Sequence, residues 1–309
     1  MYAVSKAMQL DPAAEQTKQQ ILDLVEGFTV ETTPGSAAKI PDYREHLRPG
    51  ARVAVTFLPG SDFADTVATA KRLQEEGFEP MPHFAARSIP SRQALEDYLK
   101  ALSDVTELRH VVALAGAVDQ PLGPFDSSMA VLETGLFDKY GVETIGVAGH
   151  PEGSPDFSED VAVEALRLKK GFGERTGAKV RIVTQFGFDG EKFIKWAEGL
   201  RTHGIDMPVH LGVAGPAKIT TLIKYAAMCG VGNSLDFFKK RTRSLATLAT
   251  NHSPEGVVGP IEKHWRDNPQ TAIRQVHVFP FGGIKKASEW LHERGSWSKV
   301  TQKISNETA

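Results

Sequence analysis

Residues 180–189 read VRIVTQFGFD, an apolar run rich in β-branched side chains that closes on Gly187 and Asp189. Seven other stretches have the same character, and each ends in Gly, Pro or a polar residue. A near-continuous apolar run, rather than strict alternation, is what a strand buried on both faces of a parallel sheet requires. We therefore predict seven further strands, at residues 28–34 (FTVETTP), 52–60 (RVAVTFLPG), 79–87 (EPMPHFAAR), 110–116 (HVVALAG), 143–153 (ETIGVAGHPEG), 208–216 (PVHLGVAGP) and 275–283 (QVHVFPFGG).

The segments between these runs have helical periodicity. Residues 62–77 place Val67, Ala70 and Leu73 on one face and stop at Gly77, a residue suited to a helix end. A strand followed by a helix, repeated eight times, predicts the α/β class and a (β/α)₈ TIM barrel. An open doubly wound sheet is the rival architecture, and the lack of a glycine fingerprint after the first strand argues against it. Further helices are expected at 91–103, 128–140, 158–172, 191–204 and 218–229.

Two segments fall outside the repeat. Residues 11–25 are expected to form an extra N-terminal helix, and residues 230–274 a helical insertion of two or three helices before the eighth strand. Neither segment looks like a second domain. We therefore expect residues 1–309 to form a single barrel domain, with a frayed tail after Ser296.

Composition excludes several classes of protein. The 309 residues are 41% hydrophobic and 24% charged with a net charge of -2, which lacks the basic excess of a nucleic-acid-binding protein. The N-terminus has no basic segment followed by an apolar run, and no stretch reaches the roughly 18 apolar residues of a membrane span. Cys229 is the single cysteine, which fits a reducing compartment. These features predict a cytoplasmic protein without nucleic-acid or membrane partners, and they are compatible with a homo-oligomer.

In a barrel of this kind the active site forms at the carboxyl ends of the strands. Those ends are unusually polar here, and Glu31 is the most informative of them. A carboxylate that points into a barrel would be desolvated, which would raise its pKa and suit it to act as a general acid near neutral pH. The alternative is that Glu31 faces outward into a helix contact. The other polar or glycine-bearing strand ends carry Thr56, His83, Gly116, His150, Glu152, Gln185, Asp189 and Gly282-Gly283.

The histidines do not form a metal-binding pattern. His83, His150, His210 and His277 lie on four different predicted strands, without the close pairs that zinc sites use, so no metal site is expected. For His83 and His150 the alternative to a ligand role is a ring satisfied by a backbone carbonyl. No Walker sequence or G-x-G-x-x-G is present, and Gly282-Gly283 fits either a phosphate contact or a plain tight turn.

Several of these strand ends, taken in order, resemble the methylenetetrahydrofolate reductase family. Residues 183–189 (VTQFGFD) look like that family's I-T-Q-F-F-F-D strand, and residues 110–116 (HVVALAG) like its H-x-V-A-L-R-G strand. Residues 150–152 (HPE) are similar to its Y-P-E-x-H, residues 82–83 to its P-H strand end, and residues 28–34 to its F-E-F-F-P-P. The resemblance runs from residue 28 to residue 293. It implies a flavin-containing barrel that reduces methylenetetrahydrofolate with NADH or NADPH.

The resemblance also implies roles for individual residues. Glu31 takes the place of the general acid, which protonates a folate nitrogen as the methylene bridge opens to an iminium. Gln185 would hydrogen-bond the pterin and take part in catalysis, while Tyr225 and Phe281 would lie near the substrate. The residues expected along the FAD or the nicotinamide are Thr56, His83, Gly116, His150, Glu152 and Lys169.

The chain departs from the family mainly on the flavin side. The family's R-G-D after the fourth strand reads Ala115-Gly116-Ala117, although Asp119 stands two residues on and could replace the aspartate in catalysis. Gly171 aligns with a flavin-contacting lysine, with Lys169 and Lys170 close by. These departures predict an atypical member in which FAD is weakly bound or absent and tetrahydrofolate is the better-supported ligand. A folate barrel of another reaction type, such as a methyl or methylene transfer partner, and a non-catalytic one-carbon scaffold are the alternatives.

Overall fold

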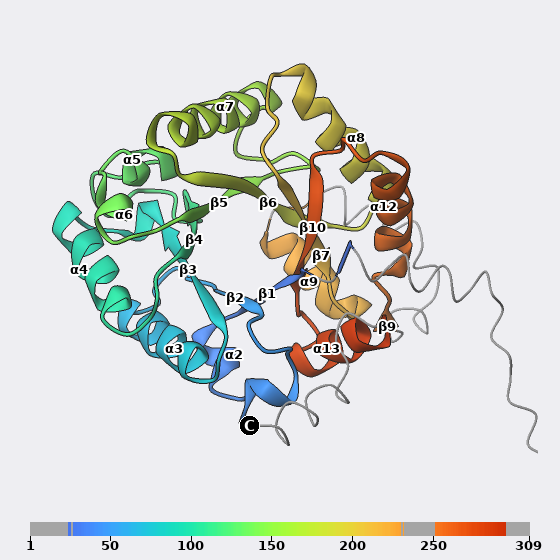
Figure 1. Ribbon diagram of the computed structural model, residues 1–309, viewed down its shortest axis with the longest axis horizontal. Helices are drawn as coiled ribbons and strands as arrows, with labels where there is room; N and C mark the ends of the chain where they lie inside the picture. The colour runs from blue at the N-terminus through green and yellow to red at the C-terminus, as the bar shows by residue number, and fades with distance from the viewer. Residues whose placement is uncertain (1–23, 26, 230, 232–250, 295–309) are drawn as a thin grey trace, which may run out of the picture.

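The computed structural model describes residues 24–25, 27–229, 231 and 251–294. In that part of the chain, eight parallel strands close into a barrel in the order β1-β10-β7-β6-β5-β4-β3-β2 (Figure 1). The predicted TIM barrel is thereby confirmed. The strands are β1 (Thr29–Thr32), β2 (Arg52–Val55), β3 (Glu79–Ala85), β4 (His110–Leu114), β5 (Thr144–Gly149), β6 (Lys179–Gly187), β7 (Val209–Ala214) and β10 (Ile273–Phe279).

The first and last strands close the barrel, and this closure positions the site. Thr29 of β1 is the Cα partner of His277 in β10 on one side and of Arg52 in β2 on the other. Partners in register point to the same face of a sheet, and alternate residues of one strand share a face. Glu31, two residues after Thr29, therefore lies on the same face as His277, although 246 residues separate them in sequence.

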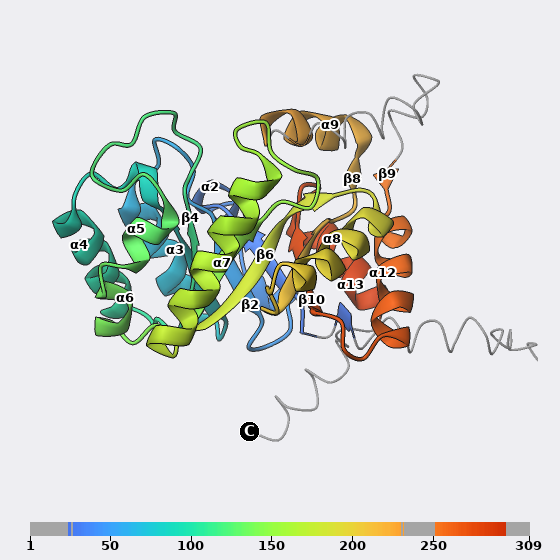
Figure 2. The ribbon, with the colours of Figure 1, turned by 90° about the horizontal axis from the view of Figure 1, so that it is seen from above.

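Helices ring the outside of the barrel (Figures 1 and 2). Several begin at polar side chains that cap the free backbone N–H groups of the first turn, as Asp62, Ser91 and Ser158 do. The connection from β1 to β2 holds only short helices, α2 (Pro34–Ala37) and η1 (Tyr43–Glu45), and η2 (Ala86–Ser88) follows β3. The longer helices are α3 (Phe63–Glu75), α4 (Arg92–Ser103), α7 (Glu159–Thr176), α8 (Gly190–Thr202), α9 (Ile219–Met228), α12 (Glu255–Asp267) and α13 (Ile284–Glu293).

One predicted helix is divided. The periodicity over residues 128–140 predicted a single helix, but the structure contains α5 (Ser128–Leu132) and α6 (Leu136–Lys139). Gly135 lies between them with a φ of 71°, in the left-handed region that ends a right-handed helix. The apolar pattern continues across this break, which is why periodicity alone did not reveal it.

The insertion before the last barrel strand contains a feature that the sequence did not predict. β8 (Ala217–Lys218) pairs antiparallel with β9 (Asn251–His252), which joins the start of α9 to the residues that precede α12. Figure 2 shows α9 at the end of the barrel where the loops that follow β4 and β5 also lie. Of the two or three helices expected over residues 230–274, α12 is present. Residues 230 and 232–250, and most of the predicted helix at 11–25, lie outside the described residues.

The large aliphatic core fills the layer between the strands and the helices, whereas the barrel interior is partly polar. Ala54, Met81 and Val112 form a small apolar cluster inside the barrel. Buried polar side chains lie on either side of it along the barrel axis. In the described ranges, every helix falls short of the length and apolar character that a bilayer crossing needs. The assignment of all 309 residues to one domain stays a prediction.

Candidate active site

Four adjacent strands bring polar side chains together around Glu31. His277 of β10 places Nε2 3.1 Å from Glu31 Oε1, and His83 of β3 places Nε2 3.6 Å from the same oxygen. Thr56, which follows β2, donates its hydroxyl to Glu31 Oε2 at 3.2 Å. The Glu31 side chain is 16% exposed, while His277 is fully buried. Glu31 is thus mostly buried, and side chains from three other strands contact both of its carboxylate oxygens.

The pKa of Glu31 differs in direction from the expectation. Burial raises this pKa, but the hydrogen bond and charge of His277, the charge of His83 and the hydrogen bond from Thr56 together outweigh burial and lower it. The prediction of a raised pKa was therefore wrong, because desolvation was considered without the two imidazoles that closure of the barrel supplies. The pKa of His83 is lowered, mainly by burial and against the attraction of Glu31.

His277 is the functional candidate that sequence reasoning missed. In the sequence, His277 is one of several histidines on separate strands, without the spacing of a metal site. Its Nδ1 lies 2.6 Å from Thr29 Oγ1, so the ring is held at both nitrogens and aimed at Glu31. The available signal was register: His277 and Glu31 fall on inward positions of the last and first strands, which a closed barrel makes neighbours.

Gln185 lies at an irregularity in β6. The pairing of β6 with β7 shifts register between Val183 and Phe186, so Thr184 and Gln185 form a bulge. Thr184 Oγ1 accepts a hydrogen bond from Gly212 N at 2.8 Å, and the Gln185 amide oxygen accepts one from Phe186 N at 3.1 Å. Bulges of this kind occur beside active sites because they re-aim a side chain. The bulge, rather than the regular pleat of the strand, therefore sets the direction of the half-buried Gln185 side chain.

Aromatic rings connect the Gln185 bulge to the Glu31 cluster. Phe279 of β10 meets the His277 ring edge-on at 5.0 Å and the Phe186 ring at 5.4 Å. Phe281 lies 4.7 Å from Phe186 and stacks on Tyr225 of α9 at 4.2 Å. The two predicted substrate-binding aromatics are therefore in contact, and they belong to an aromatic wall made of Phe186, Phe279, Phe281 and Tyr225.

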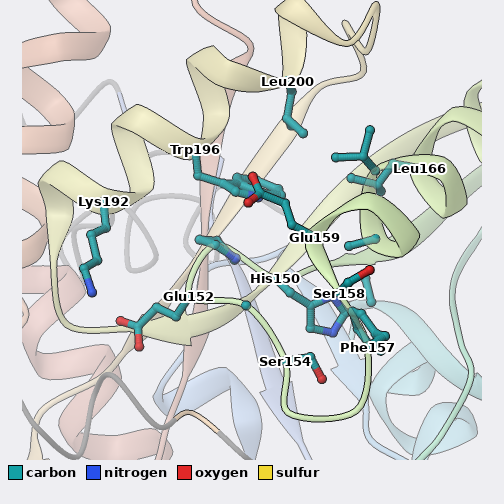
Figure 3. A pocket seen from close by; sticks show the side chains of 15 residues that line it. His150, Glu152, Ser154, Phe157, Ser158, Glu159, Leu166, Lys192, Trp196 and Leu200 are labelled. Carbon is teal, nitrogen blue, oxygen red and sulfur yellow. The ribbon is translucent and has the colours of Figure 1, made fainter.

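His150 and Glu152 lie elsewhere. They line a cavity of about 330 Å³ between α7 and α8, with Trp196 and Leu200 from α8 and Leu166 from α7 (Figure 3). The further lining residues come mainly from the loop that follows β5. Because β5 lies four strands from β1 in either direction around the barrel, the structure separates this cavity from the Glu31 cluster. His150 and Glu152 are thus separated from Glu31, Thr56 and His83.

Lys169 of α7 lies on the His150 side. Its side chain is 7% exposed, and burial lowers its pKa to about 8. Its charge also contributes, after burial, to lowering the pKa of His150, which places the two groups near each other. Among the described residues no acidic side chain pairs with Lys169, and a buried ammonium without such a partner is costly. The predicted role of Lys169 beside a cofactor stays a prediction.

We expect Lys169→Met to raise the free energy of unfolding at pH 7 by on the order of 1–3 kcal/mol, because it removes a buried charge. The sign follows from linkage. Between the folded pKa of about 8 and the higher unfolded value, the unfolded state binds more protons, so wild-type stability rises with pH. Urea unfolding at pH 7 and pH 10 measures both effects. The stability gained by Lys169→Met should be smaller at pH 10 than at pH 7. An equal gain at the two pH values would contradict the lowered pKa of Lys169.

The loop after β4 carries the remaining candidates. Gly116 has a φ of 92°, and a side chain there would press on Ala85. Asp119 is exposed on this loop, and within the described residues no hydrogen bond joins it to the Glu31 cluster. Ala115 and Ala117 are exposed as well. The proposed replacement of a family aspartate by Asp119 stays a prediction.

Comparison with known proteins identifies the family. The profile described as methylenetetrahydrofolate reductase matches residues 42–234, more than half of the chain. This chain belongs to the methylenetetrahydrofolate reductase family. The resemblance seen in the strand ends is thereby confirmed. The matched span contains Thr56, His83, Gln185 and Tyr225, while Glu31 and His277 lie outside it.

Individual relatives are distant. The 5,10-methylenetetrahydrofolate reductase of Pectobacterium carotovorum subsp. carotovorum is 30% identical over 184 residues, 58% of each chain. That of Salmonella typhimurium is 29% identical over 185 residues, 58% of this chain and 59% of its own. The match thus spans less than two thirds of these curated relatives. An uncharacterized protein from Clostridium thermocellum that binds two copies of 5-methyl-5,6,7,8-tetrahydrofolic acid shares the fold, with a TM-score of 0.54, 12% identity and coverage of 91% and 99%.

Proposed function

We propose that this chain reduces 5,10-methylenetetrahydrofolate to 5-methyltetrahydrofolate with NADH or NADPH, or runs the reverse oxidation, in the cytoplasm. The observation that carries the proposal is the Glu31 cluster at the mouth of a reductase-family barrel, joined by the aromatic wall to Gln185. A pterin hydrogen-bonded to Gln185 and packed on these rings would extend toward Glu31. Flat rings and a directed amide suit a pterin, because aromatic faces stack on it while the amide fixes its orientation.

The proton would come from the Glu31–His277 pair rather than from Glu31 alone. Because the pKa of Glu31 is lowered, its carboxyl group is ionised at neutral pH in the free protein. When His277 is doubly protonated, its Nε2 proton can pass along the 3.1 Å hydrogen bond to Glu31 Oε1, which leaves a neutral imidazole. The carboxylic acid so formed would protonate the folate nitrogen that leaves the methylene bridge, which yields an iminium carbon. The Thr29 hydroxyl at Nδ1 holds the imidazole in place during this transfer.

Nicotinamide would supply the hydride that the iminium carbon accepts. The protein's contribution is to protonate the nitrogen first and to keep water from the iminium, which hydrolysis would otherwise consume. The aromatic wall is suited to that exclusion because Phe186 is fully buried and its three neighbours are half-buried.

The described residues fit a tightly held FAD poorly. A flavin pyrophosphate is dianionic and needs fixed cations. Arg87 instead donates to the carbonyl oxygens of Asp126 and Val118, at 3.0 and 3.3 Å. Lys170 pairs with Glu174 and Asp206, and Lys285 is exposed. Lys169, in contrast to these three cations, is buried and lies near His150. No step proposed here passes through a flavin.

We expect purified protein to show little absorbance in the flavin bands, and FAD added back to bind well above the nanomolar range. The reason is the missing cation set together with the Ala115-Gly116-Ala117 loop. Introducing the lost carboxylate by Ala117→Asp should tighten or activate the flavin site, whereas the equally exposed Ala115→Asp serves as the matched control. Absorbance spectra and FAD titrations measure both. Stoichiometric, tightly held FAD in the unmodified protein would overturn this expectation.

Gln185→Ala is expected to weaken tetrahydrofolate binding by about 1–3 kcal/mol, the usual cost when a buried polar partner is lost. Flavin content should change little. Gln93→Ala, on the exposed face of α4, is the matched control and should leave affinity unchanged. Isothermal titration with 5-methyltetrahydrofolate measures the difference. Equal affinities for the wild type and Gln185→Ala would remove Gln185 from the folate site.

The reaction itself is tested by an anaerobic assay with methylenetetrahydrofolate and each nicotinamide, with and without added FAD. Oxidation of NADH or NADPH that depends on the folate supports the proposal. Folate binding without nicotinamide oxidation in any of these mixtures would contradict it and favour a methyl or methylene transfer partner. Absence of folate binding would favour a scaffold.

A further inference from the structure

The reduction proposed above consumes one proton per turnover, and His277 has no contact with solvent through which to replace it. Its side chain is 0% exposed. Both ring nitrogens are occupied, Nδ1 by the Thr29 hydroxyl at 2.6 Å and Nε2 by Glu31 Oε1 at 3.1 Å. Thr29 is itself 1% exposed, and within the described ranges its hydroxyl forms no other hydrogen bond. Among the described residues, Glu31 is therefore the group through which a proton can reach His277.

The two oxygens of Glu31 have different neighbours. Oε1 faces both imidazoles, His277 Nε2 at 3.1 Å and His83 Nε2 at 3.6 Å, whereas Oε2 accepts the Thr56 hydroxyl at 3.2 Å. A proton that arrives at Oε1 is on the atom that contacts His277, and a proton that arrives at Oε2 is not. The charge of Glu31 also acts on Cys229, but burial and that charge raise the pKa of the thiol, which stays protonated at neutral pH. His83 is thus the imidazole that shares an oxygen with His277.

His83 differs from His277 in its access to solvent. Its side chain keeps 7% exposure, and no hydrogen bond within the described part of the chain occupies either ring nitrogen. At His110 and His210, by contrast, the unpartnered Nδ1 atoms are sealed from solvent. An imidazole suits proton transfer because one ring nitrogen can accept a proton while the other releases one. Burial lowers the pKa of His83, so its ring is neutral between transfers.

We propose that His83 is a proton relay that recharges His277 from solvent through Glu31 Oε1, a role that rests on the proposed reduction. A small rotation of the ring brings Nε2 from 3.6 Å to hydrogen-bond distance of Oε1. His83 Nδ1 takes a proton from water while Nε2 gives its own to Glu31 Oε1, and Glu31 passes that proton to His277 Nε2. The result is an ionised Glu31, a doubly protonated His277 and a neutral His83, whose remaining proton returns to Nε2 by exchange with water. One solvent proton is taken up for each proton that the folate receives.

Proton uptake measured separately from hydride transfer tests the relay. During a single turnover with methylenetetrahydrofolate in weakly buffered solution, a pH-indicator dye follows uptake and nicotinamide absorbance follows oxidation. In the wild type we expect the two signals to change together. In His83→Asn, uptake should be slowed by about 10-fold or more beyond any slowing of the oxidation, because the first proton is already on His277 and only its replacement needs the relay. Added imidazole should shorten the delay by supplying the missing ring.

His264→Asn is the matched control, because His264 also contacts a glutamate, Glu198 at 3.0 Å, but outside the barrel. Uptake and oxidation should remain together in this variant. Equal slowing of both signals in His83→Asn would assign His83 to substrate binding and overturn the relay. Uptake without delay, or a delay that imidazole does not shorten, would overturn it as well. A wild type without folate-dependent nicotinamide oxidation would instead refute the proposed reduction, and the relay with it.

Nuclear magnetic resonance of the wild type with isotope-labelled histidine gives a second test that needs no folded variant at position 83. At pH 7 and without folate, we expect a doubly protonated His277 beside a neutral His83, the charge state from which the relay starts. A neutral His277 or a charged His83 under these conditions would overturn the proposal. If His83→Asn does not fold, this measurement decides.

Discussion

Glu31→Gln is expected to lower folate turnover by about 10²-fold or more while the barrel remains folded, the usual scale for losing a general acid. The amide keeps the size and part of the hydrogen bonding of the carboxylate, but it cannot carry the proton from His277 to the substrate. Steady-state rates with methylenetetrahydrofolate and the preferred nicotinamide measure the loss. Circular dichroism and the unfolding midpoint show whether the fold is retained.

A matched control for this substitution exists in the same chain. Glu198 of α8 also accepts hydrogen bonds from a histidine, His264 at 3.0 Å, and from a threonine, Thr271 at 2.5 Å, but it lies outside the barrel. Glu198→Gln therefore repeats the chemistry of the change away from the site, and turnover should stay within a factor of about two, as usual for changes remote from the reacting groups. Glu31→Gln rates within a factor of about three of the wild type would remove Glu31 from the role of proton donor.

Gly212→Ala is expected to lower the free energy of unfolding by about 2–3 kcal/mol, the range for overpacking a well-filled interior. A Cβ atom at this position would lie 2.4 Å from Thr184 O and 2.8 Å from the backbone of Gln185, and backbone atoms cannot move aside as a flexible side chain would. The strain falls on the bulge that sets Gln185, so folate affinity should fall as well. Urea unfolding and folate titration measure the two effects.

Gly199→Ala is the control for this glycine. Gly199 lies in α8 with open space around it, so alanine there should be neutral or raise stability by about 0.5–1 kcal/mol through helix propensity. If Gly212→Ala were as stable as the wild type and bound folate equally well, the close packing of β7 against the bulge would not position Gln185.

Local sequence pattern determined most of the architecture. Buried parallel strands need continuous apolar runs and the helices between them need one apolar face, so the order of elements and the closed barrel could be predicted. The sequence pattern did not predict features in which the backbone changes direction while the order of polar and apolar residues continues. Gly135 divides a helix while the apolar periodicity continues, and the strand pair β8–β9 is too short to have a recognisable pattern.

The candidate site, too, was predictable from the sequence only in part. Residue type and strand position were enough to single out Glu31, Thr56 and His83, because the carboxyl ends of barrel strands converge. The main partner of Glu31, His277, could not be predicted in this way. It reaches Glu31 because the barrel closes by pairing the first strand with the last. That contact reverses the expected direction of the Glu31 pKa shift, since burial alone raises it and two imidazoles lower it.

By itself, then, the sequence determined the strand and helix alternation, the barrel and the family, because these depend on periodicities and motifs that lie within short segments. Only the tertiary structure decided which side chains meet. It joined Glu31 to His277 and placed His150 and Glu152 on the opposite side of the barrel. It also sealed His277 from solvent and left His83 partly exposed. These features depend on distances between residues far apart in the chain, which no local pattern encodes.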